Sequence, residues 1–221
     1  MEDEYSKHTS IHQKTTPEPP PQPKTSKPFI IAIEGIDGAG KATLSKALAK
    51  LLNASVISFP QYGKTNAAKA IEQALRNANA SPWHMAQLFA QDRHEAISQL
   101  ATQPGVVIID RYVASNAAYL HAKTQYHYTL QAVEEFEYGT LNLPKPNLQI
   151  LIDTPVDIAV HRAMIRAENT GGKPDANETD RELQHRVRNA YLQMAKGHWV
   201  SPWIVISPSD RKGKYFAHRN P

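Results

Sequence analysis

The sequence predicts a single α/β domain in which helices cover both faces of a parallel sheet. Three observations support this fold class. Short apolar, β-branched runs alternate with helical stretches along most of the chain, as in successive βα units. These runs are almost entirely apolar, which is typical of strands that are buried on both faces. The chain has 221 residues, a length that favours one domain with a sizeable core.

The predicted elements follow one another without an internal repeat. Strands are predicted where β-branched residues cluster, at 29–33, 55–59, 106–109, 148–152 and 203–206. Helices are predicted where Ala, Leu and charged residues recur at helical spacing, at 41–52, 67–76, 82–101, 115–138, 156–167 and 181–198. Helices separate the strands, and such crossover connections join parallel strands.

Residues 1–27 are predicted to form a disordered tail, and the folded domain is expected to span residues 28–221. The tail holds the proline cluster 17–23 and almost no large apolar residue, so burial cannot offset the entropy lost on ordering. The alternative for this tail is a proline-rich ligand for a partner domain.

Composition excludes several classes of function. The chain has no cysteine, which removes disulfides, thiolate zinc sites and cysteine nucleophiles. The net charge is +4 without a dense Lys/Arg run, so small anions are simpler partners than nucleic acid. No apolar run is long enough to span a bilayer, and the N-terminus is polar where a signal peptide would be apolar. We therefore expect a soluble, cytoplasmic protein without a membrane partner.

The loop between the first strand and the first helix matches the phosphate-binding pattern G-x-x-x-x-G-K, with Gly35, Gly40 and Lys41 at its fixed positions. Glycines let backbone N–H groups point at a phosphate, the helix N-terminus adds a positive dipole, and the lysine adds a mobile cation. A plain tight turn is the alternative. The predicted nucleoside triphosphate-binding residues are Gly35, Ile36, Asp37, Gly38, Ala39, Gly40, Lys41, Ala42 and Thr43.

One position of this P-loop departs from the usual pattern. Ala42 stands where Ser or Thr normally offers a hydroxyl to Mg²⁺, and Thr43 comes one residue late. A metal ion must then be held mostly by other groups. Asp37 is the first candidate, because a carboxylate among phosphates is costly unless a cation lies between them.

A second candidate site follows the strand at 106–109, which delivers Asp110 and Arg111 at its carboxyl end. Ligands bind at this end of the strands in open α/β sheets. Asp110 could hold Mg²⁺ through water, and Arg111 could bind a phosphate through two parallel hydrogen bonds. A structural salt bridge is the alternative. Asp153 closes a similar strand, but Thr154 and Pro155 follow it, so we expect that acid to cap a helix.

Basic residues flank a pair of glycines near residue 171. Arg162, Arg166 and Lys173 surround Gly171 and Gly172 between two predicted helices, which suggests a flexible basic flap that closes over phosphates and excludes water. A solvated helix face with a loop explains the same pattern.

Taken together, these motifs resemble a known family. From about residue 29 to about residue 206 the chain resembles the thymidylate kinases, P-loop nucleoside monophosphate kinases that phosphorylate dTMP to dTDP with ATP. The resemblance rests on separated motifs, namely IEGIDGAGK from Ile33, FPQYG from Phe59, LFAQDR from Leu88, DRYVASNAAY from Asp110 and LPKPN from Leu143. It implies a three-layer fold with a five-stranded parallel sheet flanked by helices, a short LID flap and a homodimer.

The resemblance also implies a role for each residue on the acceptor side. Matching positions in the family stack on thymine, hydrogen-bond the base, contact its 5-methyl group, crowd the sugar 2′ position and hold the acceptor phosphate. In that order, the implied dTMP-binding residues here are Phe89; Arg93, Ser115 and Asn116; Phe59 and Pro60; Tyr119; and Tyr62 and Arg111.

For the chemistry, the resemblance implies in-line transfer of the ATP γ-phosphoryl group with Mg²⁺. The implied catalytic residues are Lys41, Arg111, Asp37 and Arg166, and the implied metal-binding acids are Asp37, Glu178 and Asp175. The sequence departs from the family pattern at Ala42, in the proline-rich head, and after Ile206, where the chain lacks the apolar helix that would be expected to finish the domain.

Other functions fit parts of the pattern. A kinase for another deoxynucleoside or nucleoside monophosphate could use the same scaffold, and a non-catalytic P-loop protein would explain Ala42. A GTP-dependent switch is disfavoured, because the chain has no Asn-Lys-x-Asp guanine motif.

Overall fold

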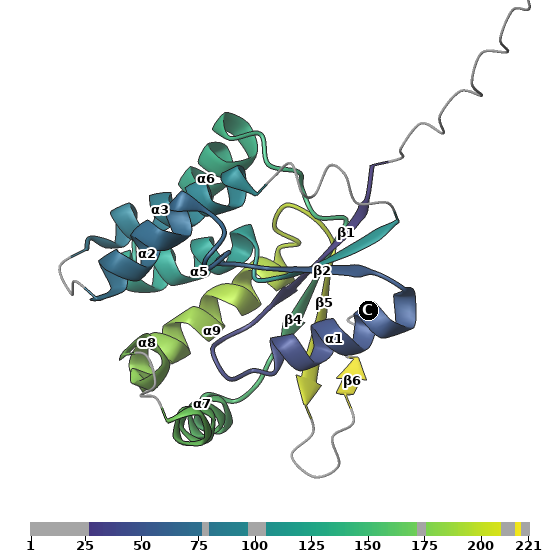
Figure 1. Ribbon diagram of the computed structural model, residues 1–221, viewed down its shortest axis with the longest axis vertical. Helices are drawn as coiled ribbons and strands as arrows, with labels where there is room; N and C mark the ends of the chain where they lie inside the picture. The colour runs from purple at the N-terminus through teal and green to yellow at the C-terminus, as the bar shows by residue number, and fades with distance from the viewer. Residues whose placement is uncertain (1–26, 77–79, 97–104, 172–175, 209–214, 218–221) are drawn as a thin grey trace, which may run out of the picture.

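The computed structural model describes residues 27–76, 80–96, 105–171, 176–208 and 215–217. The predicted tail lies outside these residues except for Lys27. Figure 1 shows a twisted sheet in the middle of the molecule with helices on either side. The strands are β1 (Phe29–Glu34), β2 (Ser55–Ser58), β3 (Val106–Asp110), β4 (Leu148–Ile152), β5 (Trp203–Pro208) and β6 (Tyr215–Ala217).

The sheet has the strand order β2-β3-β1-β4-β5-β6. The first five of these strands pair in parallel, which confirms the predicted five-stranded parallel sheet. β6 pairs antiparallel with β5, an addition that the sequence did not predict because three residues are too short for a periodic pattern. It lies in the segment after Ile206, where the sequence departs from the family pattern.

Most helices agree with the predicted stretches in type, and several differ from them in their bounds, while the short helix Ala176–Thr179 lies outside every predicted stretch. They are α1 (Lys41–Leu52), α2 (Asn66–Arg76), α3 (Pro82–Glu95), α5 (Val113–Thr124), α6 (Thr129–Glu134), the π-helical η1 (Glu135–Thr140), α7 (Val156–Thr170), α8 (Ala176–Thr179) and α9 (Arg181–Lys196). α3 ends at Glu95, and 97–101 of the predicted helix lie outside the described residues. The predicted helix 115–138 is three elements, because Gln125 adopts a left-handed conformation with φ 55° that ends α5.

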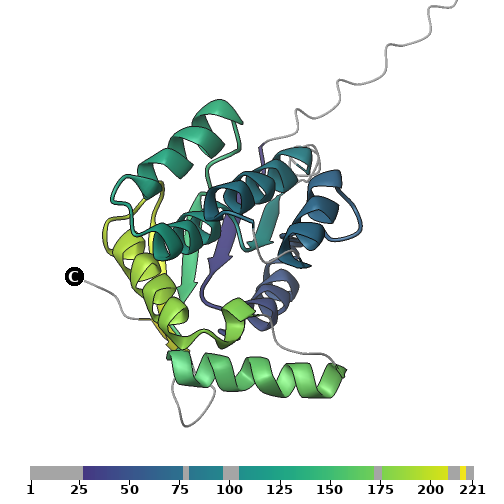
Figure 2. The ribbon, with the colours of Figure 1, turned by 90° about the vertical axis from the view of Figure 1, so that its left-hand side faces the viewer.

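Helix packing places the carboxyl edge of the sheet between two groups of helices. α1 packs against β1, β2 and β3, whereas α5 packs against α3, α6 and α9. Figure 2 shows α7 crossing beneath α9, with the short α8 between them. The central strands supply a fully buried apolar core that includes Ile33, Ile108, Ile109, Leu151 and Ile152. This core fixes the sheet edge from which the site loops emerge.

Strand register brings three of the sequence motifs to one edge of the sheet. Ile33 of β1 is paired with Asp110 of β3, and Ser58 of β2 is paired with the same Asp110. The loops that follow these residues begin with Gly35, Phe59 and Arg111. The P-loop, the FPQYG segment and the DRY segment therefore start side by side.

The LPKPN motif serves the fold at the opposite end of β1. The side chain of Asn147 accepts a hydrogen bond from the Ile30 N–H at 2.8 Å, and the Asn147 N–H donates to the Ile30 carbonyl at 2.9 Å. The Tyr112 hydroxyl donates to the Pro144 carbonyl at 2.9 Å. This motif thus ties the start of β4 to the centre of the sheet.

The prediction that Asp153 caps a helix is wrong. α7 has Pro155 at its N-cap and no side-chain cap bond. The Asp153 carboxylate instead accepts two hydrogen bonds from Arg188 of α9, from Nε at 2.5 Å and from Nη2 at 2.9 Å. A bidentate arginine satisfies both carboxylate oxygens and binds more strongly than a capping N–H. Asp153 therefore joins the end of β4 to α9.

Gly38 allows the P-loop to lie directly against α7. Its φ is +76°, and a Cβ at this position would meet the Ala159 carbonyl oxygen at 2.1 Å. Gly63 has almost the same φ of +75° but open space around the corresponding position. Substitution of Gly63 therefore tests the cost of the left-handed backbone conformation alone, whereas substitution of Gly38 adds the cost of a clash with the Ala159 carbonyl.

We predict that Gly38→Ala destabilises the protein more than Gly63→Ala. Both variants force an L-residue into the left-handed region, at about 1 kcal/mol, and only Gly38→Ala adds overpacking of about 1–3 kcal/mol. Urea unfolding of both variants and the parent chain measures the difference. Equal losses of unfolding free energy would show that the P-loop does not rest on α7.

Candidate active site

The P-loop forms a turn of backbone around the N-terminus of α1. Gly35, Gly38 and Gly40 have φ values of 145°, 76° and 104°, a conformation that glycine adopts without a Cβ penalty. Lys41 is the first residue of α1, and its Nζ donates to the Ile36 carbonyl at 2.8 Å across the loop. A glycine-rich loop that leads into a helix N-terminus, with a lysine beside it, is suitable for an anionic phosphate.

Positive and negative groups are packed closely at this loop. Burial and the nearby charge of Arg111 lower the pKa of the Lys41 ammonium to about 8. Burial opposes ionisation of Asp37, but the positive charges of Arg111 and Lys41 outweigh it and hold the pKa of that carboxyl at about 2. Asp37 is therefore a carboxylate at neutral pH, while Lys41 stays mostly protonated there but loses its proton at a lower pH than an exposed lysine does.

Arg111 connects the P-loop to the neighbouring strand. Its guanidinium donates to Asp37 through Nη2, and lies over the Tyr119 ring at 5.7 Å from the centroid. Its backbone has φ 67°, which is uncommon outside glycine and costs free energy that the surrounding contacts must supply. The Arg111 N–H donates to the Ile33 carbonyl at 3.1 Å. β1 thus holds this arginine in place beside the loop.

Asp110 precedes this arginine and is half-buried. Burial raises its pKa, although Lys41 and Arg111 lower it in part. Ala42 and Thr43 of the P-loop are both exposed. Asp37 and Asp110 are two of the carboxylates whose charges act on Lys41.

A cavity of about 330 Å³ lies beside the P-loop, a size within the range of small-molecule sites. Its lining comes from the P-loop, the FPQYG segment, α3, α5 and the segment around α8. All nine residues predicted to bind dTMP line it, namely Phe59, Pro60, Tyr62, Phe89, Arg93, Arg111, Ser115, Asn116 and Tyr119. Asp37 and Glu178 line it as well. The motifs that are separate in the sequence therefore form one site.

At the far end of the cavity, two polar side chains are held by a residue that the sequence analysis did not single out. Glu137 of η1 is fully buried and accepts from Arg93 at 2.6 Å from Nε and 2.7 Å from Nη2. The same carboxylate accepts from Asn116 Nδ2 at 2.7 Å. Burial opposes the charge of Arg93, but Glu137 outweighs this and raises its pKa above the usual value.

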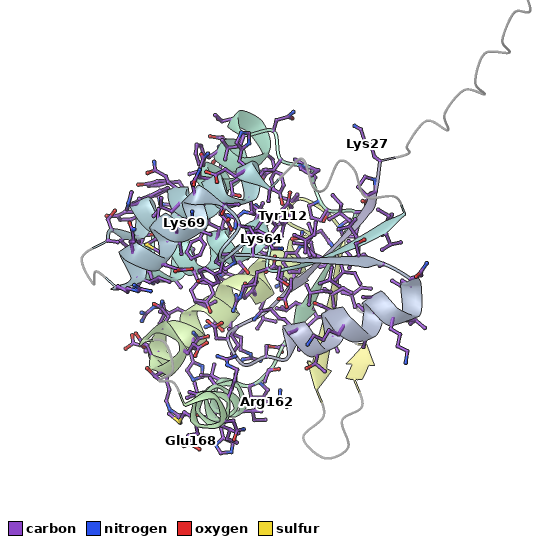
Figure 3. The ribbon with its side chains drawn as sticks, in the orientation of Figure 1. Lys27, Lys64, Lys69, Tyr112, Arg162 and Glu168 are labelled. Carbon is purple, nitrogen blue, oxygen red and sulfur yellow. The ribbon has the colours of Figure 1, made fainter. Side chains whose placement is uncertain are left out.

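A second buried acid, Glu34, lies beneath the site. It accepts from the Tyr112 N–H at 2.9 Å, the Ser115 hydroxyl at 2.6 Å and the Tyr191 hydroxyl at 3.2 Å. Burial raises the pKa of Glu34, and the hydrogen bonds from Ser115 and Tyr112 offset part of that rise. The Ser115 hydroxyl therefore donates its hydrogen to Glu34, below the cavity. Figure 3 shows Tyr112 in the interior of the molecule.

A third buried acid, Asp92, precedes Arg93 in α3. It accepts from the Gln61 N–H at 2.9 Å and from the Thr65 hydroxyl. These bonds join the FPQYG segment to the helix that carries Phe89 and Arg93. The only sequence signal for Asp92 is its place in the motif LFAQDR, and the only one for Glu34 is its place in the motif IEGIDGAGK. Glu137 has no comparable signal, since it stands within a helical stretch.

The predicted flap is described in part. Arg166 of α7 is exposed, lies outside the lining of the cavity and donates to Glu178 at 2.5 Å. Asp175 and Lys173 lie outside the described residues. Figure 3 places Arg162 on α7, and this side chain is also exposed. Within the described parts of the chain, no group of three or more His, Asp or Glu residues could by itself enclose a metal ion.

The fold and the site together define a class of protein. A P-loop that follows the central strand of a parallel sheet and faces a second ligand cavity is the arrangement of P-loop nucleoside monophosphate kinases. The sequence model of the family described as thymidylate kinase matches residues 33–210. The chain therefore belongs to the thymidylate kinase family.

Individual relatives agree with this family. The chain is 37% identical over 205 residues to the thymidylate kinase of Mycobacterium tuberculosis strain H37Rv, covering 86% of this chain and 96% of that protein. It is 30% identical over 186 residues to the probable thymidylate kinase of Methanococcus vannielii, covering 82% of this chain and 88% of that protein. Both matches include almost the whole described domain.

Solved structures support the fold. The thymidylate kinase of Candida albicans has a TM-score of 0.62 at 24% identity, covering 82% of this chain and 84% of that chain. The thymidylate kinase of Ehrlichia chaffeensis has a TM-score of 0.57 at 19% identity, covering 85% and 90%. Among the helices that the structure describes, none is long and apolar enough to cross a membrane.

We predict that Lys41 takes up a proton when a nucleoside triphosphate binds at the P-loop. With a pKa of about 8, about half of the Lys41 side chains are uncharged at pH 8. A bound triphosphate favours the ammonium form and returns the missing charge. Isothermal titration of ATP at pH 8 in buffers of different ionisation enthalpy should give an uptake of about half a proton.

The uptake should shrink toward zero at pH 6.5, where Lys41 is already charged, after correction for protons that ATP itself exchanges. Lys41→Gln should abolish the uptake at pH 8. Uptake that persists in this variant would assign the proton to another group.

Proposed function

We propose that this thymidylate kinase family member transfers the γ-phosphoryl group of ATP to the phosphate of dTMP and forms dTDP. The observation that carries the proposal is that Asp37 of the P-loop and all nine predicted acceptor residues line the same cavity. Donor phosphates at the P-loop and an acceptor phosphate at Arg111 would then be neighbours. Relatives that are named thymidylate kinases support the same acceptor.

The polar groups in the cavity match the edge of a thymine base. Thymine presents an N–H donor at N3 and a carbonyl acceptor at O4. Asn116 donates its two amide hydrogens to the Ala86 carbonyl and to Glu137. Its Oδ1 can therefore accept from the thymine N3–H. Arg93 uses two of its five N–H groups on Glu137, and the others can serve O4.

Apolar residues of the cavity fit the remaining parts of dTMP. We propose that Phe89 stacks on the base, that Phe59 and Pro60 contact the 5-methyl group, and that Tyr119 crowds the sugar 2′ position. A methyl contact contributes about 1–3 kcal/mol, so discrimination against dUMP should be partial.

The proposed chemistry is a direct in-line transfer without a covalent enzyme intermediate. The acceptor phosphate is already an anion, so no side chain has to act as a general base. Catalysis then consists of positioning the two phosphates and neutralising charge. Lys41 and Arg111 supply the positive charge, and Asp37 orients the Arg111 guanidinium through their ion pair. Tyr119 donates to Asp37 at 2.5 Å and holds that carboxylate from the other side.

The residues present fit a magnesium ion, which would neutralise charge on the transferred phosphoryl group. Mg²⁺ is commonly bound by one or two carboxylates together with phosphate oxygens and water. Asp37 is ionised, and Asp110 lies close enough to influence the same charges. We propose Asp37 and Asp110 as the acids that hold it in place of a hydroxyl at residue 42. Glu178 belongs to this set only if it leaves its ion pair with Arg166.

The resemblance also implies a homodimer, which stays a prediction. It is supported by exposed aromatic side chains on the segment from α5 to η1, at Tyr126, Tyr128 and Phe136. A second chain could cover these rings, and sedimentation equilibrium would decide between one chain and two.

A comparison of five possible phosphoryl acceptors tests the proposed function. We expect ADP release with dTMP to exceed that with dUMP by about 10–200-fold in kcat/KM, and dCMP, AMP and thymidine to be used far less. A coupled assay with ATP and Mg²⁺ measures all five acceptors. Preference for another acceptor would make the chain a different kinase on this scaffold, and absence of turnover with every acceptor would make it a non-catalytic relative.

A second prediction concerns the metal. Asp37→Asn should raise the Mg²⁺ concentration for half-maximal turnover by about tenfold, equivalent to about 1.4 kcal/mol, because it removes one negative charge beside the phosphates. Asp157→Asn, an exposed acid on α7, is the matched control. Equal Mg²⁺ dependence in both variants would contradict the assignment of Asp37.

A further inference from the structure

Glu137 holds the two side chains that face the proposed base. It lies in the π-helical turn η1, more than forty residues after Arg93, and none of its surface is exposed. One carboxylate oxygen accepts from Arg93 Nε at 2.6 Å. The other accepts from Arg93 Nη2 and from Asn116 Nδ2, both at 2.7 Å. A single buried carboxylate therefore fixes the guanidinium and the amide relative to each other.

The chemistry of the neighbours determines which way the Asn116 amide points. Its Nδ2 donates to Glu137 and to the Ala86 carbonyl at 2.9 Å. A carboxylate and a backbone carbonyl can only accept. If the amide were flipped, its oxygen would face two acceptors, and two buried hydrogen bonds would be lost to repulsion. One orientation of Asn116 is therefore strongly favoured, with Oδ1 directed away from both neighbours.

We infer that Glu137 is a positioning residue that determines base specificity, by holding Asn116 as an acceptor next to Arg93 as a donor at the base end of the cavity. This inference rests on the proposed function. The resulting pair of groups matches a base with an N–H beside a carbonyl, as in thymine and uracil. Cytosine presents an acceptor nitrogen and an amino group at the same positions, so both of its groups would meet a group of the same kind. Rejection of cytosine arises from these mismatches rather than from shape.

The variant Glu137→Gln changes the hydrogen-bonding groups that orient Asn116 while it keeps the size of the side chain at this position. Glutamine has almost the same size but carries one acceptor oxygen and one amide donor, so it no longer opposes a flip of Asn116, which only the Ala86 carbonyl then resists. We expect the ratio of kcat/KM for dTMP to that for dCMP to fall by at least about tenfold. The KM for ATP should stay within about twofold, because the P-loop is not contacted by Glu137.

Two comparisons make the test specific. Glu135→Gln removes the same charge from an exposed position of the same turn and should leave the dTMP to dCMP ratio unchanged. In an Asn116→Ala background, Glu137→Gln should no longer change the ratio by more than about twofold, because the amide whose orientation Glu137 fixes is gone, while the Arg93 guanidinium is a donor in every orientation.

Glu137→Asp covers the case in which Glu137→Gln does not fold, as judged by circular dichroism and thermal unfolding. Aspartate is still only an acceptor, so the ratio should remain within about threefold of the parent value even if the KM for dTMP rises. The inference is overturned if folded Glu137→Gln keeps the parental ratio, or if Glu137→Asp loses the ratio by tenfold or more. Turnover of dTMP by the parent chain tests the proposed function separately, since it does not depend on either variant.

Discussion

The pairing of β1 with β3 is the constraint on which the site depends. It sets Ile33 opposite Asp110, and the Arg111 N–H then donates to the Ile33 carbonyl. One residue further along each strand, the Glu34 carboxylate accepts from the Tyr112 N–H. A shift of this register by one residue would turn each side chain to the opposite face. The donor loop and the acceptor arginine are thus placed by the same ladder of backbone bonds that builds the core.

The charge of Asp37 explains how Lys41 and Arg111 can lie close together at the P-loop when no nucleotide is bound. Lys41 is buried and the nearby Arg111 is partly buried, which would be costly for two cations without a counter-charge. Asp37 provides that charge through its ion pair with Arg111. Phosphates that enter the site would offer these cations new partners, and Asp37 would be released toward a metal ion. In this view Ala42 does not damage the P-loop, because the carboxylate that would replace the missing hydroxyl is already in place.

The sequence predicted the parts of this protein that depend on local pattern or on the family resemblance. The five parallel strands, the P-loop and the nine cavity residues are of this kind. It could not predict interactions that form only between distant segments. Glu137 stands inside a stretch predicted as one helix, and only the break into α5, α6 and η1 brings it to Arg93. Thr154 and Pro155 after Asp153 predicted a helix cap, because the pattern could not reveal the actual partner Arg188, which lies 35 positions away in the sequence.

Buried carboxylates organise the site at three places, and their chemistry suggests why acids are used. Glu34 holds the start of α5, Asp92 holds the FPQYG segment, and Glu137 holds the base-facing pair. A buried amide could do the same work without the cost of removing a charge from water. An amide, however, can exchange donor and acceptor by flipping, whereas a carboxylate accepts in every orientation. Each acid therefore fixes the direction of its donors, and the free energy spent on burial yields one arrangement of the site rather than several.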